Sequence, residues 1–554
     1  MKKEITKLLS IVVCLLVLIV LTACNGIGPQ TEPAGDKTKT ILRIGNLYSG
    51  LGDDWLTTIE KNFEEAYANT SFEEGKIGVD LVIDNSGSYS GAKVLEISDK
   101  NDIWMSYLVD YYDLVSRGLA LEITDVVTSD LGDVSPSEAG VTIESKMSPN
   151  IKETFKTIGN NKYYGLPFYE TYYGIVYDVD LFNENDFYFI KDYDRNGSLV
   201  DMFVSSASDP KSCGPDGEYG TYDDGLPETY EDFYNLCRYI LAFNVIPMCY
   251  PGQFMHYWLR YFFQVWADYE GEEQMSLNFS LSGNATDLVD ISSDDALLIK
   301  DSSTITSANS YELQKQAGKY YTLKFAKTLA TNSNWFSQSS RATGQSQEMN
   351  QKEFLYSRKK TPIAMCLDGS WFNCESDSAY TDMVNSGDKT AGRYTRNIGF
   401  MPVPKATADK VGEKQTIVDS SRSIVFISSK IDEAKIEAAK LFMKYFHTNE
   451  SLAIWTYKTE TTRPYSYTVD ETKLSSYGKS IMNIHNNSTI IFPYSTNLAY
   501  LQNFTIFNLD SWAFTTTKGY SNPFTTFRDT QVTIKDYFDG MYSSTKASVE
   551  SAIR

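Results

Sequence analysis

Short apolar strands alternate with amphipathic helices near the start of this sequence. Residues 41–46 (ILRIGN) read as a first strand, and residues 79–84 (VDLVID) read as a second. Between these two strands, apolar side chains recur at helical spacing from Trp55 to Ala66. A third strand, residues 102–108 (DIWMSYL), is followed by a further helix. This alternation predicts an α/β fold in which helices cover a parallel sheet.

The middle of the chain combines an aromatic helical region with a polar stretch. Residues 226–243 carry Thr229 at the N-cap and Asp232 three positions later, which predicts a helix with a capping box. Residues 250–267 (YPGQFMHYWLRYFFQVWA) predict a strongly aromatic helix. Residues 270–310 are polar and rich in turn formers, so they predict an inserted hairpin or a long loop.

The composition restricts the partners and the chemistry of the chain. A net charge of −22 at pH 7 repels nucleic acid and anionic lipid. Tyrosine, present 39 times, suits wet pockets because it joins an apolar ring to a hydroxyl, although a general tyrosine bias would give the same count. The three histidines offer little material for a zinc site or a His-based triad. The pairing of five cysteines stays open: Cys213, Cys237, Cys249, Cys366 and Cys374.

The N-terminus predicts a secreted and lipid-anchored protein. Lysines precede an apolar run at residues 8–21, which is too short to span a membrane and reads as part of a signal peptide over residues 1–23. The run ends in LTAC, which resembles a lipobox, so Cys24 would carry fatty acyl chains such as palmitate. The alternative is an ordinary signal peptide with a stray cysteine. Residues 24–39 read as a flexible tether.

Five further motifs carry a resemblance to a known family. They are YYGLPFYETYYGIVYDVDLF (163–182), FLYSRKKTPIAMCLDGSWF (354–372), IGFMPVPKA (398–406), SIVFISSKIDEAKIEAAKLFMKYF (423–446) and TTRPYSY (461–467). Each is unspecific alone, but in this order and after a lipobox they resemble the extracellular solute-binding proteins of ABC importers (family 1, the maltose and sugar-binding type). The resemblance covers essentially the whole mature chain. The usual member is shorter, and the extra length lies near residues 186–225 and 270–310.

The resemblance implies a two-lobed α/β fold of the periplasmic-binding-protein type (type II). The ligand cleft would lie between two lobes joined by crossing hinge segments. Residues 40–170 and 420–466 would form lobe 1, and residues 171–419 and 467–554 would form lobe 2.

The same resemblance implies a receptor without a required cofactor. A monomer anchored on the extracellular face of the cell membrane would capture a carbohydrate, expected to be an oligosaccharide, and deliver it to the permease of an ABC importer. Its lobes would close on the ligand by a hinge motion. A surface-anchored glycoside-acting enzyme is the alternative, because any two of the many acids could form a catalytic pair, although no motif marks one. A structural adhesin is a third interpretation, but adhesion does not require hinge crossings.

Trp371 is the leading candidate for sugar contact. In the family, the Gly-x-Trp that follows the strand matched by PIAMCLDGSW often supplies a sugar-stacking ring. The local pattern agrees, because IAMCL reads as a buried strand whose carboxyl end is a typical ligand position in α/β sheets. Asp368 in the turn would accept hydrogen bonds from sugar hydroxyls. The alternative is that Trp371 begins a helix and packs inward.

The resemblance places six further candidates around the cleft. Lobe 2 would supply Tyr250 and Trp258 from the aromatic helix. Lobe 1 and the crossing segments would supply the others, namely Trp55, Glu170, Tyr172 and Arg463.

KDYDRNGSLVD, residues 191–201, partly copies a calcium-binding loop. Asp192, Asp194 and Asn196 alternate and precede a glycine, as in the first half of such a loop. The usual acid at the twelfth position is missing, and Asp201 falls two residues short. A second acidic stretch, residues 214–227, would be repelled without a cation, so we predict a structural calcium ion. The alternative is a solvated acidic loop with Asx turns.

Overall fold

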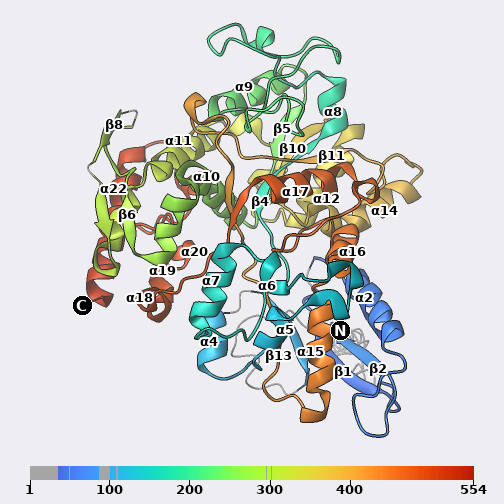
Figure 1. The fold of residues 1–554 in the computed structure, drawn as a ribbon. Helices are drawn as coiled ribbons and strands as arrows, with labels where there is room; N and C mark the ends of the chain where they lie inside the picture. The colour runs from blue at the N-terminus through green and yellow to red at the C-terminus, as the bar shows by residue number, and fades with distance from the viewer. Residues whose placement is uncertain are drawn as a thin grey trace, which may run out of the picture.

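The computed structural model describes residues 35–48, 50–85, 100–107, 110–294, 296–300 and 302–553. Two four-stranded sheets form the centres of two lobes, one below the other in Figure 1. The predicted signal peptide (residues 1–23) and Cys24 lie outside the described residues. No helix within the described ranges is long and apolar enough to cross a membrane.

The sheet of lobe 1 has the strand order β13-β3-β1-β2. Its strands are β1 (Thr40–Gly45), β2 (Val79–Asp84), β3 (Ile103–Ser106) and β13 (Ile424–Ile427). As the alternating pattern predicts, β1 is parallel to both β2 and β3. Strand β13 returns from a distant part of the chain and pairs with β3 in antiparallel fashion. The helices of this lobe are α2 (Asp54–Ala66), α4 (Tyr111–Ser116), α5 (Thr124–Thr128), α6 (Ile143–Lys146), α7 (Pro149–Ile158), α15 (Ile436–Tyr445) and α16 (Asn449–Thr459).

The sheet of lobe 2 has the strand order β11-β4-β10-β5. Its strands are β4 (Tyr173–Asp178), β5 (Ile246–Cys249), β10 (Ile363–Gly369) and β11 (Ile398–Met401). Strand β10 is parallel to β5 and antiparallel to β4. All seven residues of β10 are buried, which agrees with its continuous apolar sequence. Around this sheet lie α8 (Val179–Glu184), α9 (Tyr230–Leu241), α10 (His256–Ser280), α11 (Ala317–Thr331), α12 (Gln347–Tyr356), α13 (Phe372–Glu375), α14 (Asp377–Asn385) and α17 (Ser476–Asn487).

The predicted helices of the middle region form, with shifted boundaries. The capping box at the start of α9 is present, with Thr229 and Asp232 bonded to each other's backbone N–H groups. Helix α10 begins only at His256, because the preceding Pro251 and Gly252 interrupt the predicted helix. The helix then continues to Ser280, with a break at Gly271 whose φ is 69°.

Residues 270–280 continue α10 instead of forming the predicted loop, and the rest of the polar stretch forms small strands in two antiparallel pairs, one nested inside the other. Their pairs are β6 (Gly283–Ala285) with β9 (Ser303–Ile305), and β7 (Val289–Ser293) with β8 (Ala296–Ile299). A further parallel pair joins β12 (Thr416–Val418) to β14 (Thr489–Ile491). The C-terminal region adds α18 (Leu498–Gln502), α19 (Phe504–Phe507), α20 (Leu509–Trp512), α21 (Pro523–Thr526) and α22 (Ile534–Ala552).

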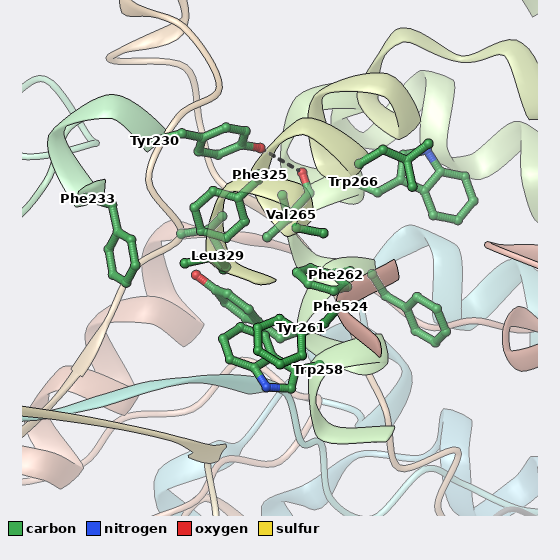
Figure 2. Close-up of a cluster of buried hydrophobic side chains, with 14 of the residues drawn as sticks. Tyr230, Phe233, Trp258, Tyr261, Phe262, Val265, Trp266, Phe325, Leu329 and Phe524 are labelled. Carbon is green, nitrogen blue, oxygen red and sulfur yellow. Dashed lines mark hydrogen bonds between the residues drawn. The ribbon is translucent and has the colours of Figure 1, made fainter. Parts of the chain in front are cut away.

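Each lobe has its own aromatic core. In lobe 2, Trp258 on α10 stacks on Phe524 with ring centroids 4.3 Å apart (Figure 2). In lobe 1, Trp55 on α2 packs edge-on against Trp455 at 4.5 Å. Burying a large apolar side chain stabilises the folded state by about 1.5–3 kcal/mol relative to leaving it exposed. These rings therefore stabilise each lobe from within its own core.

Three segments connect the elements of the two lobes, and most of their residues are buried: residues 169–173 lead into β4, residues 419–423 lead from β12 to β13, and residues 461–465 follow α16. The first two are joined by hydrogen bonds from the Thr171 N–H to Asp419 Oδ1 at 2.9 Å and from the Ser420 N–H to the Thr171 carbonyl at 2.7 Å. The first and third are joined through the Glu170 N–H and the Thr462 carbonyl at 3.2 Å. Buried main-chain pairing of this kind fixes the register of the segments relative to one another.

Candidate functional site

The two lobes face each other across a cleft of about 370 Å³. Lobe 1 lines it with residues that follow β1 and β3, at the carboxyl ends of those strands, where ligands bind in open α/β sheets. Lobe 2 contributes the start of α10 and the residues after β10. The lining residues are Leu47, Gly50, Leu51 and Tyr107 from lobe 1; Tyr169, Thr171, Tyr173, Ser420 and Ser421 from the crossing segments; and His256, Tyr257, Arg260, Trp371 and Glu375 from lobe 2.

Three aromatic rings meet in this cleft. The ring centroids of Trp371 and Tyr173 are 4.8 Å apart at an interplanar angle of 84°. Those of Tyr173 and Tyr257 are 5.0 Å apart at 90°, and those of Tyr257 and Trp371 are 6.1 Å apart at 76°. Edge-to-face contacts are a favoured geometry for aromatic pairs. Rings that meet at right angles can contact a bulky ligand from more than one side.

Trp371 is held by the strand that precedes it. It follows β10 directly and packs against apolar side chains of both lobes. A Cβ atom at Gly369 would lie 2.2 Å from the Trp371 ring, so only glycine permits this placement of the indole. Trp371 thus lines the cleft just after the fully buried strand β10, and it also stands at the N-cap of α13 (Phe372–Glu375), as the alternative interpretation expects; its contact with a sugar stays a prediction.

Two carboxyl groups lie next to Trp371 and share one amide. The Gln351 Nε2 group donates to Asp368 Oδ2 at 3.2 Å and to Glu375 Oε2 at 2.6 Å. Burial raises the pKa of Asp368 well above its usual range, and the neighbouring Glu375 raises it further. Burial likewise raises the pKa of Glu375. Only Glu375 lines the cleft, so Asp368 orients Gln351 from behind while Glu375 can bond a ligand hydroxyl.

The arginine Arg260 lines the same cleft as Glu375. The Arg260 guanidinium lies 5.8 Å from the centroid of the Tyr173 ring and donates to Asp510 Oδ2 at 3.0 Å. Burial lowers the pKa of His256, and the positive charge of Arg260 lowers it further. His256 is therefore held neutral at pH 7, and Arg260 is the charged donor on this side of the cleft.

The first crossing segment presents alternate residues to two different cavities. Tyr169, Thr171 and Tyr173 line the cleft, whereas Glu170 lines a second pocket of about 340 Å³. Tyr172 is buried among apolar side chains near β10. Successive side chains of an extended segment point to opposite faces, which explains this division. The residues predicted from the sequence, Glu170 and Tyr172, are therefore one position away from the residues of this segment that line the cleft.

The other candidates from lobes 1 and 2 lie away from the cleft lining. Trp55 and Trp258 are 1% and 0% exposed and belong to the cores of their lobes. Tyr250 is also buried, and its hydroxyl accepts a hydrogen bond from Arg528. Among the eight predicted ligand-binding residues, the structure thus places Trp371 in the cleft and Asp368 directly behind it.

Glu170 and Arg463 hold the crossing segments together. Glu170 accepts hydrogen bonds from the Thr462 hydroxyl and from His485. The Arg463 guanidinium donates to the carbonyl oxygens of Phe168 and Phe446 and is fully buried, and this burial lowers its pKa to about 10. Arg463 therefore bonds the main chain of the hinge and does not face the cleft.

The predicted calcium loop does not gather its side chains around a common point. Within the described ranges, no group of three or more His, Cys, Asp or Glu side chains could hold a metal ion. Asp192, Asp194, Asn196 and Asp201 are all exposed, and Asp194 instead accepts from the Asn196 N–H, as in an Asx turn. A positively charged side chain also lies in this region: the Arg195 guanidinium pairs with Glu228 and Asp232, next to the second acidic stretch. Both partners lie just outside residues 214–227, so Arg195 adds positive charge beside the second stretch without pairing with its acids.

Comparisons with known proteins identify the fold. No family model matches the sequence, and no curated protein does. Among solved structures, the apo form of RafE from Streptococcus pneumoniae is 14% identical with a TM-score of 0.54, over 94% of this chain and 100% of that one. RafE in complex with raffinose is 13% identical with a TM-score of 0.51, and a chitin oligosaccharide binding protein is 14% identical with the same TM-score; both cover 93% of this chain and 100% of their own. The chain therefore has the two-lobed α/β fold of these binding proteins, which confirms the fold implied by the sequence resemblance.

Proposed function

We propose that this protein captures an oligosaccharide in the cleft and delivers it to the permease of an ABC importer. The observation that carries the proposal is the group of three perpendicular rings, Trp371, Tyr173 and Tyr257, in a cleft between two lobes. Sugars have apolar CH faces and polar edges, and sites that hold them combine aromatic surfaces with a few well-placed polar groups. Raffinose and chitin oligosaccharide are the ligands named for the similar structures.

The rim of the cleft offers the polar partners that sugar hydroxyls need. Glu375 can accept hydrogen bonds, Arg260 can donate them, and the hydroxyl of Ser420 can do either. These groups come from lobe 2 and from a crossing segment, while Tyr107 comes from lobe 1. A ligand that contacts all of them binds the closed arrangement better than an open one, which is all that hinge closure requires.

The lobe boundaries near residues 170, 420 and 466 are part of the proposal. They are supported by the three hydrogen-bonded crossing segments, which lie at or near those positions. The chain acts as a monomer in this proposal, because one copy supplies both walls of the cleft.

Anchoring through Cys24 is supported by the sequence LTAC after the apolar run. One acyl chain holds a protein on a membrane only marginally, whereas two acyl chains hold it stably. A doubly acylated Cys24 would keep the receptor on the extracellular face of the cell membrane, next to the permease, and the following residues 25–39 would give it reach.

The proposal is tested by incubating the purified chain with a panel of oligosaccharides. Binding should raise the melting temperature and give a calorimetric signal, while chromatography of the mixture should show unchanged saccharide. Release of product would favour the glycoside-acting enzyme, and loss of that product in Glu375→Gln would identify Glu375 as its acid. A panel without a single binder would refute capture of oligosaccharides.

A further inference from the structure

The cleft continues past Arg260 into a narrow recess. Arg260 and Ser420 line both the cleft and the recess, so the two spaces adjoin. The recess has a volume of about 30 Å³, and about 10–15 Å³ is enough to hold a water molecule, so a small polar group fits there. Arg422 from the crossing segment and Asp510 from α20 also line it.

Arg260 has an unused donor. Its Nε atom is buried and has no hydrogen-bond partner in the described part of the chain. Its one ion pair is with Asp510, whose side chain is 46% exposed, and such exposed pairs are weak. A buried donor without a partner is costly, which points to a ligand acceptor at this position.

Arg422 is a second cation on the same recess. Its backbone φ is 45°, a left-handed conformation that is uncommon for residues other than glycine and that clusters at functional sites. The guanidinium lies 5.3 Å from the centroid of the Phe504 ring, and it forms no ion pair with any residue that the structure describes. Burial raises the pKa of Asp110 and the charge of Arg422 opposes that rise, but no salt bridge joins the two groups.

The acids around the recess are already engaged. Asp419 lines it, but its Oδ1 accepts from the Thr171 and Ser421 N–H groups and its Oδ2 accepts from the Ser421 hydroxyl. Burial raises the pKa of Asp419 to about 7, which reduces its negative charge at neutral pH. Asp510 faces solvent and is shared with Arg260. Neither acid takes up the free Nε donor of Arg260 or forms a salt bridge with Arg422 among the described residues.

We propose that the recess between Arg260 and Arg422 binds the carboxylate of a hexuronic acid unit in the oligosaccharide, a specificity that rests on the proposed function. Guanidinium groups match the planar geometry of a carboxylate and bind it through paired hydrogen bonds. The sugar ring that carries the carboxylate would lie in the adjoining cleft, beside Tyr173, which the Arg260 guanidinium already approaches. The receptor thus takes acidic oligosaccharides in preference to neutral ones of the same size.

The test compares each acidic saccharide with its own methyl ester. Oligogalacturonides, oligomannuronates and glucuronic-acid disaccharides are titrated by calorimetry beside the matching methyl esters, which keep the ring but lose the charge. A charged hydrogen bond to a carboxylate changes affinity by roughly 10- to 150-fold, so at least one acid should bind tighter than its ester by that factor. Its affinity should fall with ionic strength, while that of the ester should not.

Two substitutions assign the effect to the recess. Arg422→Gln should remove most of the preference for the acid while leaving the ester's affinity within about twofold, because Arg422 lines the recess and not the cleft. Arg260→Gln should weaken both ligands, because Arg260 also lines the cleft, but it should weaken the acid more than the ester. Arg238→Gln, which removes an exposed arginine paired with Glu231 on α9, is the control and should change nothing. Melting curves establish that each variant is folded.

The outcomes separate this inference from the proposed function. If esters or neutral oligosaccharides bind as tightly as the acids, or if the Gln variants weaken both equally, the carboxylate site is refuted and the receptor stands. If no saccharide of either kind binds, both proposals fail.

Discussion

Substituting Trp371 with alanine is the sharpest test of the cleft. Tyr173 and Tyr257 already cover part of the indole. A large aromatic side chain buries 150–250 Å² in full, so about 100 Å² remains for a ligand, and at about 25 cal/mol/Å² it contributes about 2.5 kcal/mol. The dissociation constant measured by calorimetry should therefore rise by roughly 70-fold.

The same substitution has a second effect that the structure reveals. Trp371 packs against apolar side chains of both lobes, so its loss leaves a gap as well as an empty binding surface. A partly buried ring of this kind should cost about 1–2 kcal/mol of unfolding free energy. Tyr356→Ala, at an exposed tyrosine on α12, is the matched control. A Trp371→Ala protein that melts lower but binds its saccharide normally would refute the role of the indole in binding.

Four further substitutions test which residues of the first crossing segment face the cleft, the pH dependence of stability from Asp419, and the lipid anchor. Tyr173→Ala should weaken saccharide binding at least tenfold by calorimetry, whereas Tyr172→Phe should leave binding unchanged, because only Tyr173 lines the cleft. The reverse result would show that the even-numbered residues of the crossing segment face the ligand. The pKa of Asp419 lies at about 7, above its value in the unfolded chain, so the folded state gains a proton and the stability from Asp419 falls as pH rises from about 4 to 7. In denaturant titrations, Asp419→Asn should make the free energy of unfolding fall less steeply with pH, by at most about 1.4 kcal/mol per pH unit. An unchanged slope would contradict the raised pKa of Asp419. Cys24→Ser should release the protein into the medium, and its retention in membranes would refute acylation.

The sequence predicts the lobes better than it predicts the cleft. Strands β1 and β3 are short and largely apolar, β10 begins with the apolar run IAMCL, and the capping box of α9 is local, so each can be predicted without knowledge of the fold. Trp371 was also predictable, because the turn after a buried strand lies at the sheet edge where ligands bind.

The other cleft residues depend on contacts between distant segments. Tyr173 and Tyr172 are both tyrosines, and only the pairing of the crossing segment with residues 419–423 decides which of them faces the ligand. The aromatic helix shows the same limit. Its pattern does not separate Trp258, which stacks on Phe524 far along the chain, from Tyr257, which lines the cleft one residue earlier.

The crossing segment links the cleft to the second pocket through one extended backbone. Tyr169 and Thr171 point into the cleft, and Glu170 between them points into the other pocket, where it meets His485 on α17. Main-chain bonds to Asp419 and Thr462 prevent the segment from slipping by one residue. A hinge built in this way can change the angle between the lobes but cannot exchange the residues that face the ligand. In the proposed receptor, the even-numbered side chains would therefore affect closure only through the second pocket, and the odd-numbered side chains would contact the saccharide.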